Sequence, residues 1–316
     1  MPKYRLAGFS LSLELMAYEM AHEKIVGRFA PSPSGPLHFG SLACALASYL
    51  DVKARQGQWL VRMEDLDPPR EIKGASRHIL NQLEDRGLYW DGGVLYQSHR
   101  LEAYAEAVSF LKDKQLAYHC QCNRKRVAEL DGIYDNRCRN LGLDRQKNAT
   151  RLALSEQVGS VSFDDQVMGH VKQNVHLTVG DFIIQRRDEL FSYQLAVTID
   201  DAFQKVTRVM RGSDLLDSTP RQIYLQQCFG YHQPSYAHVP IAVTSDGQKL
   251  SKQNLAAGLP AGNESSNLCS ALNWLQQSPP KRLSSLSATE IIAWATQNWD
   301  QSKLPAHLTA PAPKGF

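Results

Sequence analysis

The ten residues from Pro31 to Gly40, PSPSGPLHFG, are of the types found in phosphate-binding loops. Prolines restrict the backbone of this segment, whereas Gly35 and Gly40 allow a ligand to approach closely. Helical spacing of apolar residues follows directly, so unpaired N–H groups and the positive end of the helix dipole face the loop. His38 adds a donor that is neutral or cationic. The segment therefore predicts a phosphate site between a strand and a helix.

This segment resembles the HIGH signature of the class I aminoacyl-tRNA synthetases in its glutamate-specific form. The string HFGS at 38–41 occupies the four motif positions, so Ser41 replaces the last histidine. The second hallmark of that class, a mobile KMSKS-type loop, is matched by KLSKQ at 249–253, after a predicted strand that ends near Thr244. The two motifs agree with the class in their order, their separation and their positions at strand ends.

The resemblance implies a reaction that joins a carboxylate of glutamate to the α-phosphorus of ATP and expels pyrophosphate. Negative charge then develops on phosphate oxygens, where a nearby cation stabilises the transition state. Lys252, and secondarily Lys249, would supply that charge from the mobile loop, while His38, Gly40 and the helix N-terminus hold the other side of ATP. Mg²⁺ is expected with the ATP phosphates. This chemistry needs no nucleophilic side chain, and we find no Ser-His-Asp or Cys-His arrangement in the sequence.

A glutamate substrate presents two carboxylates and one ammonium group, so its pocket needs about two guanidinium groups and one carboxylate. Arg28, just before the phosphate loop, and Arg211, in RVMRGSDLL, are the predicted guanidinium groups. Glu64, at the end of the second predicted strand, is the predicted carboxylate. The resemblance adds Ser32 and Tyr193 to the pocket. Two arginines favour glutamate over glutamine, and the sequence leaves open which arginine binds which carboxylate.

Cys120, Cys122 and Cys138 lie within nineteen residues of one another. Three thiolates in a segment poor in aliphatic residues suit one tetrahedral Zn²⁺, whose binding energy replaces a hydrophobic core. Spacing leaves the fourth ligand open, with His119 a candidate on ligand chemistry; the glutamyl-type insert that this segment resembles implies Tyr134. The alternative is a set of three buried or free thiols.

Basic residues cluster at 124–126, with Arg137 and Arg139 nearby, and again at Arg186 and Arg187. Placed near an ATP site, these side chains would bind the phosphates of an RNA backbone. Solvent-exposed charged faces are the ordinary explanation of such clusters, so the sequence leaves both interpretations open.

Strand patterns alternate with helical ones, which predicts an α/β fold with a Rossmann-like parallel sheet in two halves and ligands at the carboxyl ends of its strands. Strands are expected at 24–30 and 58–64 and helices at 41–55, 72–86 and 99–113; regular α/β signals return at 181–188, 193–200, 206–212, 221–229 (helical) and 238–244. Two further helices are expected near 266–277 and 288–298, before a loose tail. The predicted units are an N-terminal extension (1–24), the first half of the catalytic domain (25–117), an insert (118–192) with a zinc module at about 118–148, the second half with the KMSKS-like loop (193–258) and a short C-terminal helical extension with the tail (259–316).

Composition excludes several classes of protein. Of the 316 residues 43% are hydrophobic, and the formal net charge is only +3, which excludes a disordered chain and a polycation that binds through bulk charge. No apolar run approaches the roughly 18 residues that span a bilayer. We expect a cytoplasmic monomer that does not bind membranes. Residues 1–19 are interpreted as a dispensable tail or a start codon placed too far upstream.

The resemblance extends from about Ile25 to about Ala257. A full glutamyl-tRNA synthetase continues into a helical domain that reads the anticodon, whereas little sequence follows here. The chain thus resembles the truncated paralogues, the glutamyl-Q tRNA(Asp) synthetases, which implies transfer of glutamate to queuosine in the anticodon stem-loop of tRNA(Asp). The alternatives are a minimal glutamyl-tRNA synthetase that charges the 3′ end of tRNA(Glu), and a non-catalytic, zinc-dependent tRNA-binding module.

Overall fold

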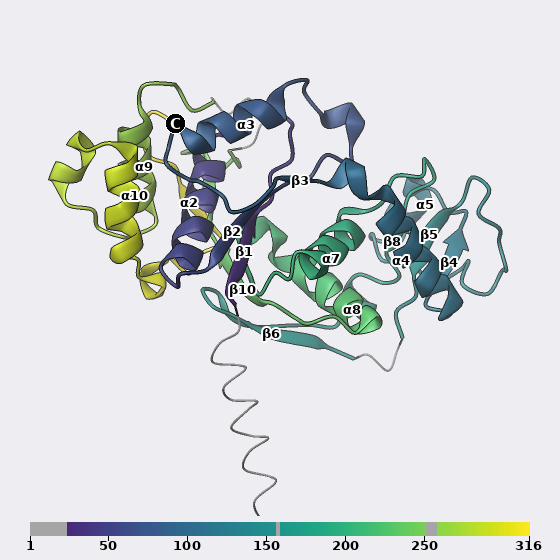
Figure 1. Cartoon of the computed structure of the whole chain (residues 1–316). Helices are drawn as coiled ribbons and strands as arrows, with labels where there is room; N and C mark the ends of the chain where they lie inside the picture. Colours follow the sequence, from purple (N-terminus) through teal and green to yellow (C-terminus); the bar gives the residue numbers. More distant parts are fainter. Residues whose placement is uncertain (1–23, 156–158, 251–257) are drawn as a thin grey trace, which may run out of the picture.

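The computed structural model describes residues 24–155, 159–250 and 258–316, and a five-stranded sheet lies at its centre (Figure 1). The strands are β1 (Val26–Phe29), β2 (Gln58–Met63), β3 (Leu95–Tyr96), β9 (Arg208–Gly212) and β10 (Ser235–Val239). They run parallel in the spatial order β10-β9-β1-β2-β3. The order places β1 in the middle, with β2 and β3 on one side and the later strands β9 and β10 on the other. The predicted α/β class with a parallel sheet is confirmed.

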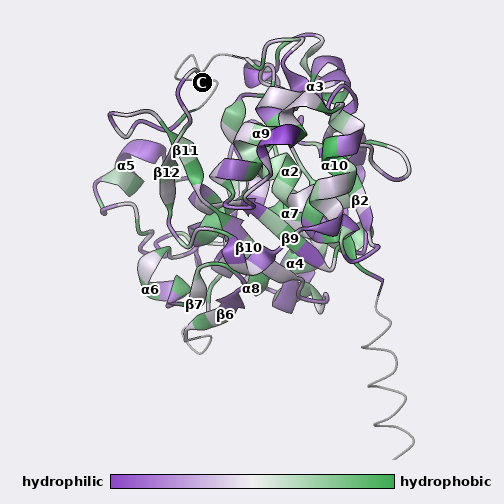
Figure 2. Cartoon of the chain, turned by 90° about the vertical axis from the view of Figure 1, so that its left-hand side faces the viewer, coloured by the Kyte–Doolittle hydropathy of each residue, from purple (hydrophilic) through white to green (hydrophobic). Residues whose placement is uncertain are grey.

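Helices cover both faces of the sheet, and each face has its own hydrophobic core. On one face lie α2 (Phe39–Lys53), α3 (Ala75–Glu84), α9 (Glu264–Trp274) and α10 (Ala288–Gln297). On the other lie α4 (Leu101–Asp113), α7 (Tyr193–Phe203) and α8 (Thr219–Phe229). The six helices expected from apolar spacing are present, with ends that differ by at most three residues, and segment 193–200 belongs to helix α7. Hydrophobic residues concentrate in the centre of the molecule, around α2 and α7 (Figure 2).

Successive side chains of β2 point to opposite faces of the sheet. Trp59 and Val61 face the core beside α2, whereas Leu60 and Arg62 point to the opposite face, where Arg62 reaches Asp201 of α7. The face of the sheet beside α2 is therefore apolar, whereas the face beside α7 contains the buried charge of Arg62.

The insert between the two halves of the sheet has an antiparallel sheet of its own, in the order β4-β5-β8. Segment 181–188, expected to resume the α/β pattern, instead carries a strand of this small sheet, because apolar periodicity cannot tell which sheet a strand joins. The elements of the insert are β4 (Ala117–Cys120), α5 (Arg124–Ala128), β5 (Ala149–Leu152), the hairpin β6 (Val161–Asp165) and β7 (Gly169–Gln173), α6 (Val175–Thr178) and β8 (Ile183–Gln185).

The C-terminal residues are ordered against the catalytic half, so the expectation of a loose tail is wrong. The strand expected at 238–244 breaks at Pro240, which has no N–H to donate, and its second part is β11 (Ile241–Val243). The exposed edge of β11 pairs with β12 (Thr309–Pro311), and the ring of Phe316 packs 4.5 Å from that of Phe39 at the start of α2. The end of the chain thus covers the region around the N-terminus of α2.

Candidate active site

A cavity of about 590 Å³ lies beside the carboxyl ends of β1, β2 and β9. Six of the residues predicted to act on substrates line it: Ser32, His38, Gly40, Glu64, Tyr193 and Lys249. Arg28 and Arg211 are buried and do not line the cavity, but they touch or act on residues that do. Lys252 lies outside the described residues. The structure thus brings together residues that are more than 200 positions apart in the chain.

The HFGS string shapes the N-terminus of α2. His38 is the N-cap residue: its Nδ1 accepts the N–H of Ser41 at 3.3 Å, and Ser41 Oγ accepts the N–H of His38 at 2.8 Å. Because Nδ1 accepts, a neutral His38 carries its proton on Nε2. A side chain at Gly40 would place its Cβ 3.3 Å from the His38 ring. Ser41 therefore orients the imidazole, and the lack of a side chain at Gly40 leaves room for the ring.

Three charged residues form a buried network next to Glu64. Arg62 Nη1 and Arg28 Nε donate to the same oxygen of Asp201, at 2.7 and 3.0 Å. Arg62 Nη2 lies 3.6 Å from Glu64 Oε1, and that oxygen has no hydrogen-bond partner in the described part of the protein. The network holds the Glu64 carboxylate at the wall of the cavity.

Burial and neighbouring charges shift the pKa values of the two carboxyl groups in this network. Burial raises the pKa of Glu64, and the guanidinium groups of Arg62 and Arg28 oppose it only in part. For Asp201 burial also acts to raise the pKa, but Arg28 and Arg62 outweigh it and hold the pKa below the usual range of a carboxyl. Asp201 is therefore the fixed anion of the network, whereas Glu64 gains from a cation bound in the cavity.

Arg211 is held by a second buried chain of hydrogen bonds. Its Nε donates to His238 Nε2 at 3.1 Å, Nη2 to Thr219 Oγ1 at 2.9 Å and Nη1 to Tyr193 Oη at 3.3 Å. His238 Nδ1 in turn lies 2.6 Å from Asp165 Oδ2. Burial lowers the pKa of His238 although Asp165 opposes the shift, so His238 is neutral, donates from Nδ1 and accepts from Arg211.

The two predicted arginines differ in how their charge is balanced. Arg28 forms an ion pair with Asp201, whereas no carboxylate of the described residues lies within 4.0 Å of the Arg211 guanidinium. Arg211 contacts Tyr193 at the cavity wall with its charge uncompensated. Lys249, at the mouth of the cavity, pairs with Asp214 at 2.5 Å and is half exposed.

The three clustered cysteines meet in the insert. Their sulfur atoms all lie within 4.8 Å of one another, and Cys122 Sγ is 3.6 Å from Cys138 Sγ. Tyr134 Oη lies 3.4 Å from Cys120 Sγ and 3.6 Å from Cys122 Sγ. A tetrahedral Zn²⁺ with sulfur at about 2.3 Å needs donor separations of about 3.8 Å, so this donor set fits the ion.

His119 is not part of this cluster. It neighbours Cys120 in β4, so its side chain points to the other face of the strand, where Nδ1 lies 3.3 Å from Thr150 Oγ1. Arginines surround the cluster instead: Arg151 Nε donates to Cys120 Sγ at 3.2 Å and Arg126 Nη1 to Cys122 Sγ at 3.5 Å. Of the two fourth ligands considered, only Tyr134 is in place.

Comparison with known proteins places this geometry in a family. The family described as tRNA synthetases class I (E and Q), catalytic domain, matches residues 24–261. A relative from Pseudomonas aeruginosa, named glutamyl-Q tRNA(Asp) synthetase, is 51% identical over 90% of this chain and 97% of its own length. The chain belongs to the glutamyl-Q tRNA(Asp) synthetases. It is therefore an enzyme, a ligase of the class I aminoacyl-tRNA synthetase type.

Other glutamyl-Q tRNA(Asp) synthetases are similarly close. Those of Klebsiella pneumoniae and Escherichia coli are each 48% identical, over 93% and 91% of this chain and 99% and 92% of their own. The crystal structure of a glutamate tRNA ligase from Elizabethkingia meningosepticum, in complex with its amino acid, has a TM-score of 0.75 and 23% identity, covering 92% of this chain and 67% of that one. This likeness shows the class I fold. In the part of the chain that the structure describes, no helix has the length and apolar character needed to cross a membrane.

Sequence reasoning missed four residues of this glutamyl-Q tRNA(Asp) synthetase site: Arg62, Asp201, Asp165 and His238. A signal existed for Arg62, which is the one charge in the apolar strand QWLVRM and must have a partner if the strand is central. The partner of Arg62, Asp201, comes from α7, and the partner of His238, Asp165, comes from the hairpin of the insert. Nothing in the local sequence of either aspartate indicates that it reaches the sheet.

Proposed function

We propose that the chain activates L-glutamate with ATP as glutamyl-adenylate and transfers the glutamyl group to queuosine at the first anticodon position of tRNA(Asp). The observation that carries the activation step is the single cavity shared by the capped N-terminus of α2, His38, Glu64 and Lys249. The acceptor is proposed from the family to which the chain belongs.

Glutamate recognition would use the unbalanced charges of the site. The Glu64 carboxylate, which lines the cavity, would accept the substrate ammonium group, and the resulting ion pair would lower the pKa of Glu64. Arg211 would attract a carboxylate beside Tyr193, because its charge has no carboxylate partner. Arg28 is already paired with Asp201, so it would act more weakly, and Ser32 would complete the wall.

In the activation step a carboxylate oxygen of glutamate attacks the α-phosphorus of ATP, a new P–O bond forms, and the bond to pyrophosphate breaks. Donors on both sides of the phosphates stabilise the charge that develops. The α2 N-terminus with His38 Nε2–H and Gly40 would supply one side, and Lys249 with Lys252 the other. Mg²⁺ would accompany the phosphates. A hydroxyl of the acceptor then attacks the acyl carbon and AMP leaves.

The insert would hold one structural Zn²⁺ through Cys120, Cys122, Cys138 and Tyr134. Their donor separations support this ligand set, as does the burial of Cys120, Cys138 and Tyr134, beside which Cys122 is half-buried. The ion would supply cohesion that the few apolar residues of this segment lack.

The test is transfer of labelled glutamate to three RNAs: tRNA(Asp) with queuosine, tRNA(Asp) without it, and tRNA(Glu). We expect label only on the first, and retained after removal of its 3′ terminus. Label on the 3′ end of tRNA(Glu) would instead identify a minimal glutamyl-tRNA synthetase.

A site variant and a control sharpen the activation step. Glu64→Gln should reduce kcat/KM for glutamate in ATP–pyrophosphate exchange by at least tenfold, because the ammonium group loses its ion pair. Glu84→Gln, an exposed position on α3, is the matched control and should change nothing. Folded wild-type protein without glutamate-dependent exchange would favour a non-catalytic tRNA-binding module.

A further inference from the structure

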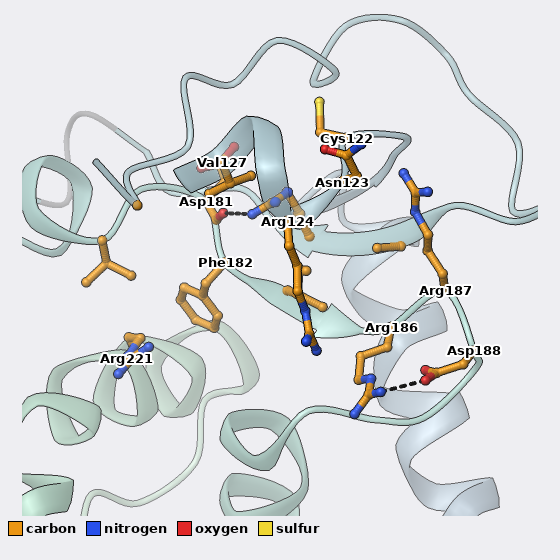
Figure 3. Close-up of a pocket in the computed structure, with 15 residues that line it drawn as sticks. Cys122, Asn123, Arg124, Val127, Asp181, Phe182, Arg186, Arg187, Asp188 and Arg221 are labelled. Atoms are coloured by element: carbon orange, nitrogen blue, oxygen red, sulfur yellow. Dashed lines mark hydrogen bonds and ion pairs between the residues drawn. The ribbon is translucent and has the colours of Figure 1, made fainter. Parts of the chain in front are cut away.

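A second cavity, of about 530 Å³, lies outside the catalytic one (Figure 3). Its walls come from α5, β5 and β8 of the insert, from the loop after β8 and from the first turn of α8. None of the residues predicted for ATP or glutamate lines it. Arginine is its most frequent lining residue, and the side chains that matter below are Arg124, Arg186, Arg187 and Arg221.

The charge of this cavity is not neutralised within the protein. Arg186 forms an ion pair with Asp188 at 2.6 Å. By contrast, Arg124, Arg187 and Arg221 have no carboxylate within 4.0 Å among the described residues; Arg187 and Arg221 contact only neutral oxygens. Three guanidinium groups therefore face one cavity without an ion pair among the described residues, although Asp181 and Asp188 also line it.

Arg221 is the most constrained of the three. Burial lowers its pKa, and its Nε is buried without a hydrogen-bond partner. An arginine held in this way costs free energy unless an anion compensates it. Its remaining hydrogen bonds go to the carbonyl of Asp217 and the hydroxyl of Ser218, and the carboxylate of Asp217 acts on it without forming an ion pair.

The same turn of α8 also connects this cavity with the active site. Thr219, two residues before Arg221, accepts from Arg211, and Ser218 accepts from Gln194, the neighbour of Tyr193. A ligand seated on Arg221 therefore lies next to the residues proposed to hold glutamate.

We infer that this cavity binds the phosphodiester backbone of the RNA acceptor, so that Arg124, Arg187 and Arg221 contact successive phosphates beside the catalytic cavity. Figure 3 shows the three side chains spread across the cavity rather than converging on one point. A small anion needs converging donors, whereas a polyanionic chain is matched by spaced ones. The inference rests on the proposed function, because it supplies the binding site of that function's RNA substrate.

The test compares Arg124→Gln, Arg187→Gln, Arg221→Gln and the triple variant with wild type in direct binding of queuosine-bearing tRNA(Asp) at several salt concentrations. Each lost phosphate contact should lower the slope of log K against log salt by about 0.7 to 0.9, so the triple variant should lose about two to three. Transfer to tRNA(Asp) should fall relative to ATP–pyrophosphate exchange. Arg221→Lys keeps the charge and should recover part of the binding.

Arg282→Gln is the matched control, since this exposed arginine belongs to the C-terminal extension packed against α9. It should match wild type in slope and transfer. A triple variant that unfolds at the wild-type temperature and keeps the wild-type slope would overturn the inference. Wild-type protein that binds tRNA(Asp) with arginine-dependent affinity but transfers no glutamate would overturn the proposed function and leave the RNA site standing.

Discussion

The catalytic cavity and the cysteine cluster hold their polar groups in opposite ways. Around the cavity, Arg28, Arg62 and Asp201 neutralise one another inside a sheet that has a hydrophobic core on each face. In the insert, Cys120, Cys138 and Tyr134 are themselves the buried core, with the half-buried Cys122 packed against them and arginines as their polar neighbours. The first site is therefore built by the fold, whereas the second is the one for which we propose a metal ion.

The largest effect is expected from breaking the internal charge balance of the catalytic half. Asp201→Ala leaves the guanidinium groups of Arg28 and Arg62 buried without their anion and should cost about 3–5 kcal/mol in the free energy of unfolding. Denaturant unfolding measures this loss. Asp188→Ala, at an exposed ion pair, is the control and should cost at most about 1 kcal/mol. Equal losses in both variants would show that the network is not the support of the site.

The next largest effect is expected on the rate of activation, from removal of the lysine side chain at position 252. Lys252→Ala should lower the rate of glutamate-dependent ATP–pyrophosphate exchange by about 10²–10³, because the charge that this lysine meets develops in the transition state. The Kd for glutamate, measured calorimetrically, should stay near wild type. A matching loss in the Kd would contradict the assignment.

Breaking the hydrogen-bond chain to Arg211 should have a smaller effect, which is on KM for glutamate and depends on pH. His238→Phe removes the acceptor of Arg211 Nε and should raise KM for glutamate about tenfold with little change in kcat. The low pKa of His238 means that folding favours its neutral form; this stability is present above the ordinary histidine pKa and is lost as the pH falls through the lowered pKa.

The measurement for this chain is KM for glutamate against pH in wild type and His238→Gln, whose amide oxygen can still accept. Wild-type KM should rise at acidic pH, and the glutamine variant should show a smaller rise, because protonation of Glu64, whose pKa is raised by burial, contributes in both proteins. A rise of the same size in both would mean that another group controls the pH dependence.

Disrupting the cysteine cluster is expected to have the smallest effect on the structure of the whole molecule. Cys138→Ser should release zinc and increase amide hydrogen exchange in residues 118–148, while the exchange of β1, β2 and β9 stays as in wild type. Cys269→Ser, in α9 of the C-terminal extension, should retain the metal. Unchanged metal content in Cys138→Ser would reject this ligand set, and loss of protection in the sheet would show that the two regions are not independent.

The sequence alone was sufficient for the α/β class and for the six helices with clear apolar spacing. The site residues that line the cavity came from the two motifs and from charge types that match a glutamate substrate, and Ser32 and Tyr193 came from the family resemblance alone. The cysteine spacing predicted a cluster, since three thiols in a short segment with few apolar residues are expected to meet. The family resemblance supplied Tyr134.

Tertiary structure decided what those residues touch. Arg28 pairs with Asp201 and Arg211 with His238, so two arginines that look equivalent in the sequence differ in free charge. Pairing also decided that the tail joins β11 and that segment 181–188 joins the small sheet. Such contacts join residues far apart in the chain, and they depend on which side chain reaches a buried charge or an open strand edge, which no local pattern encodes.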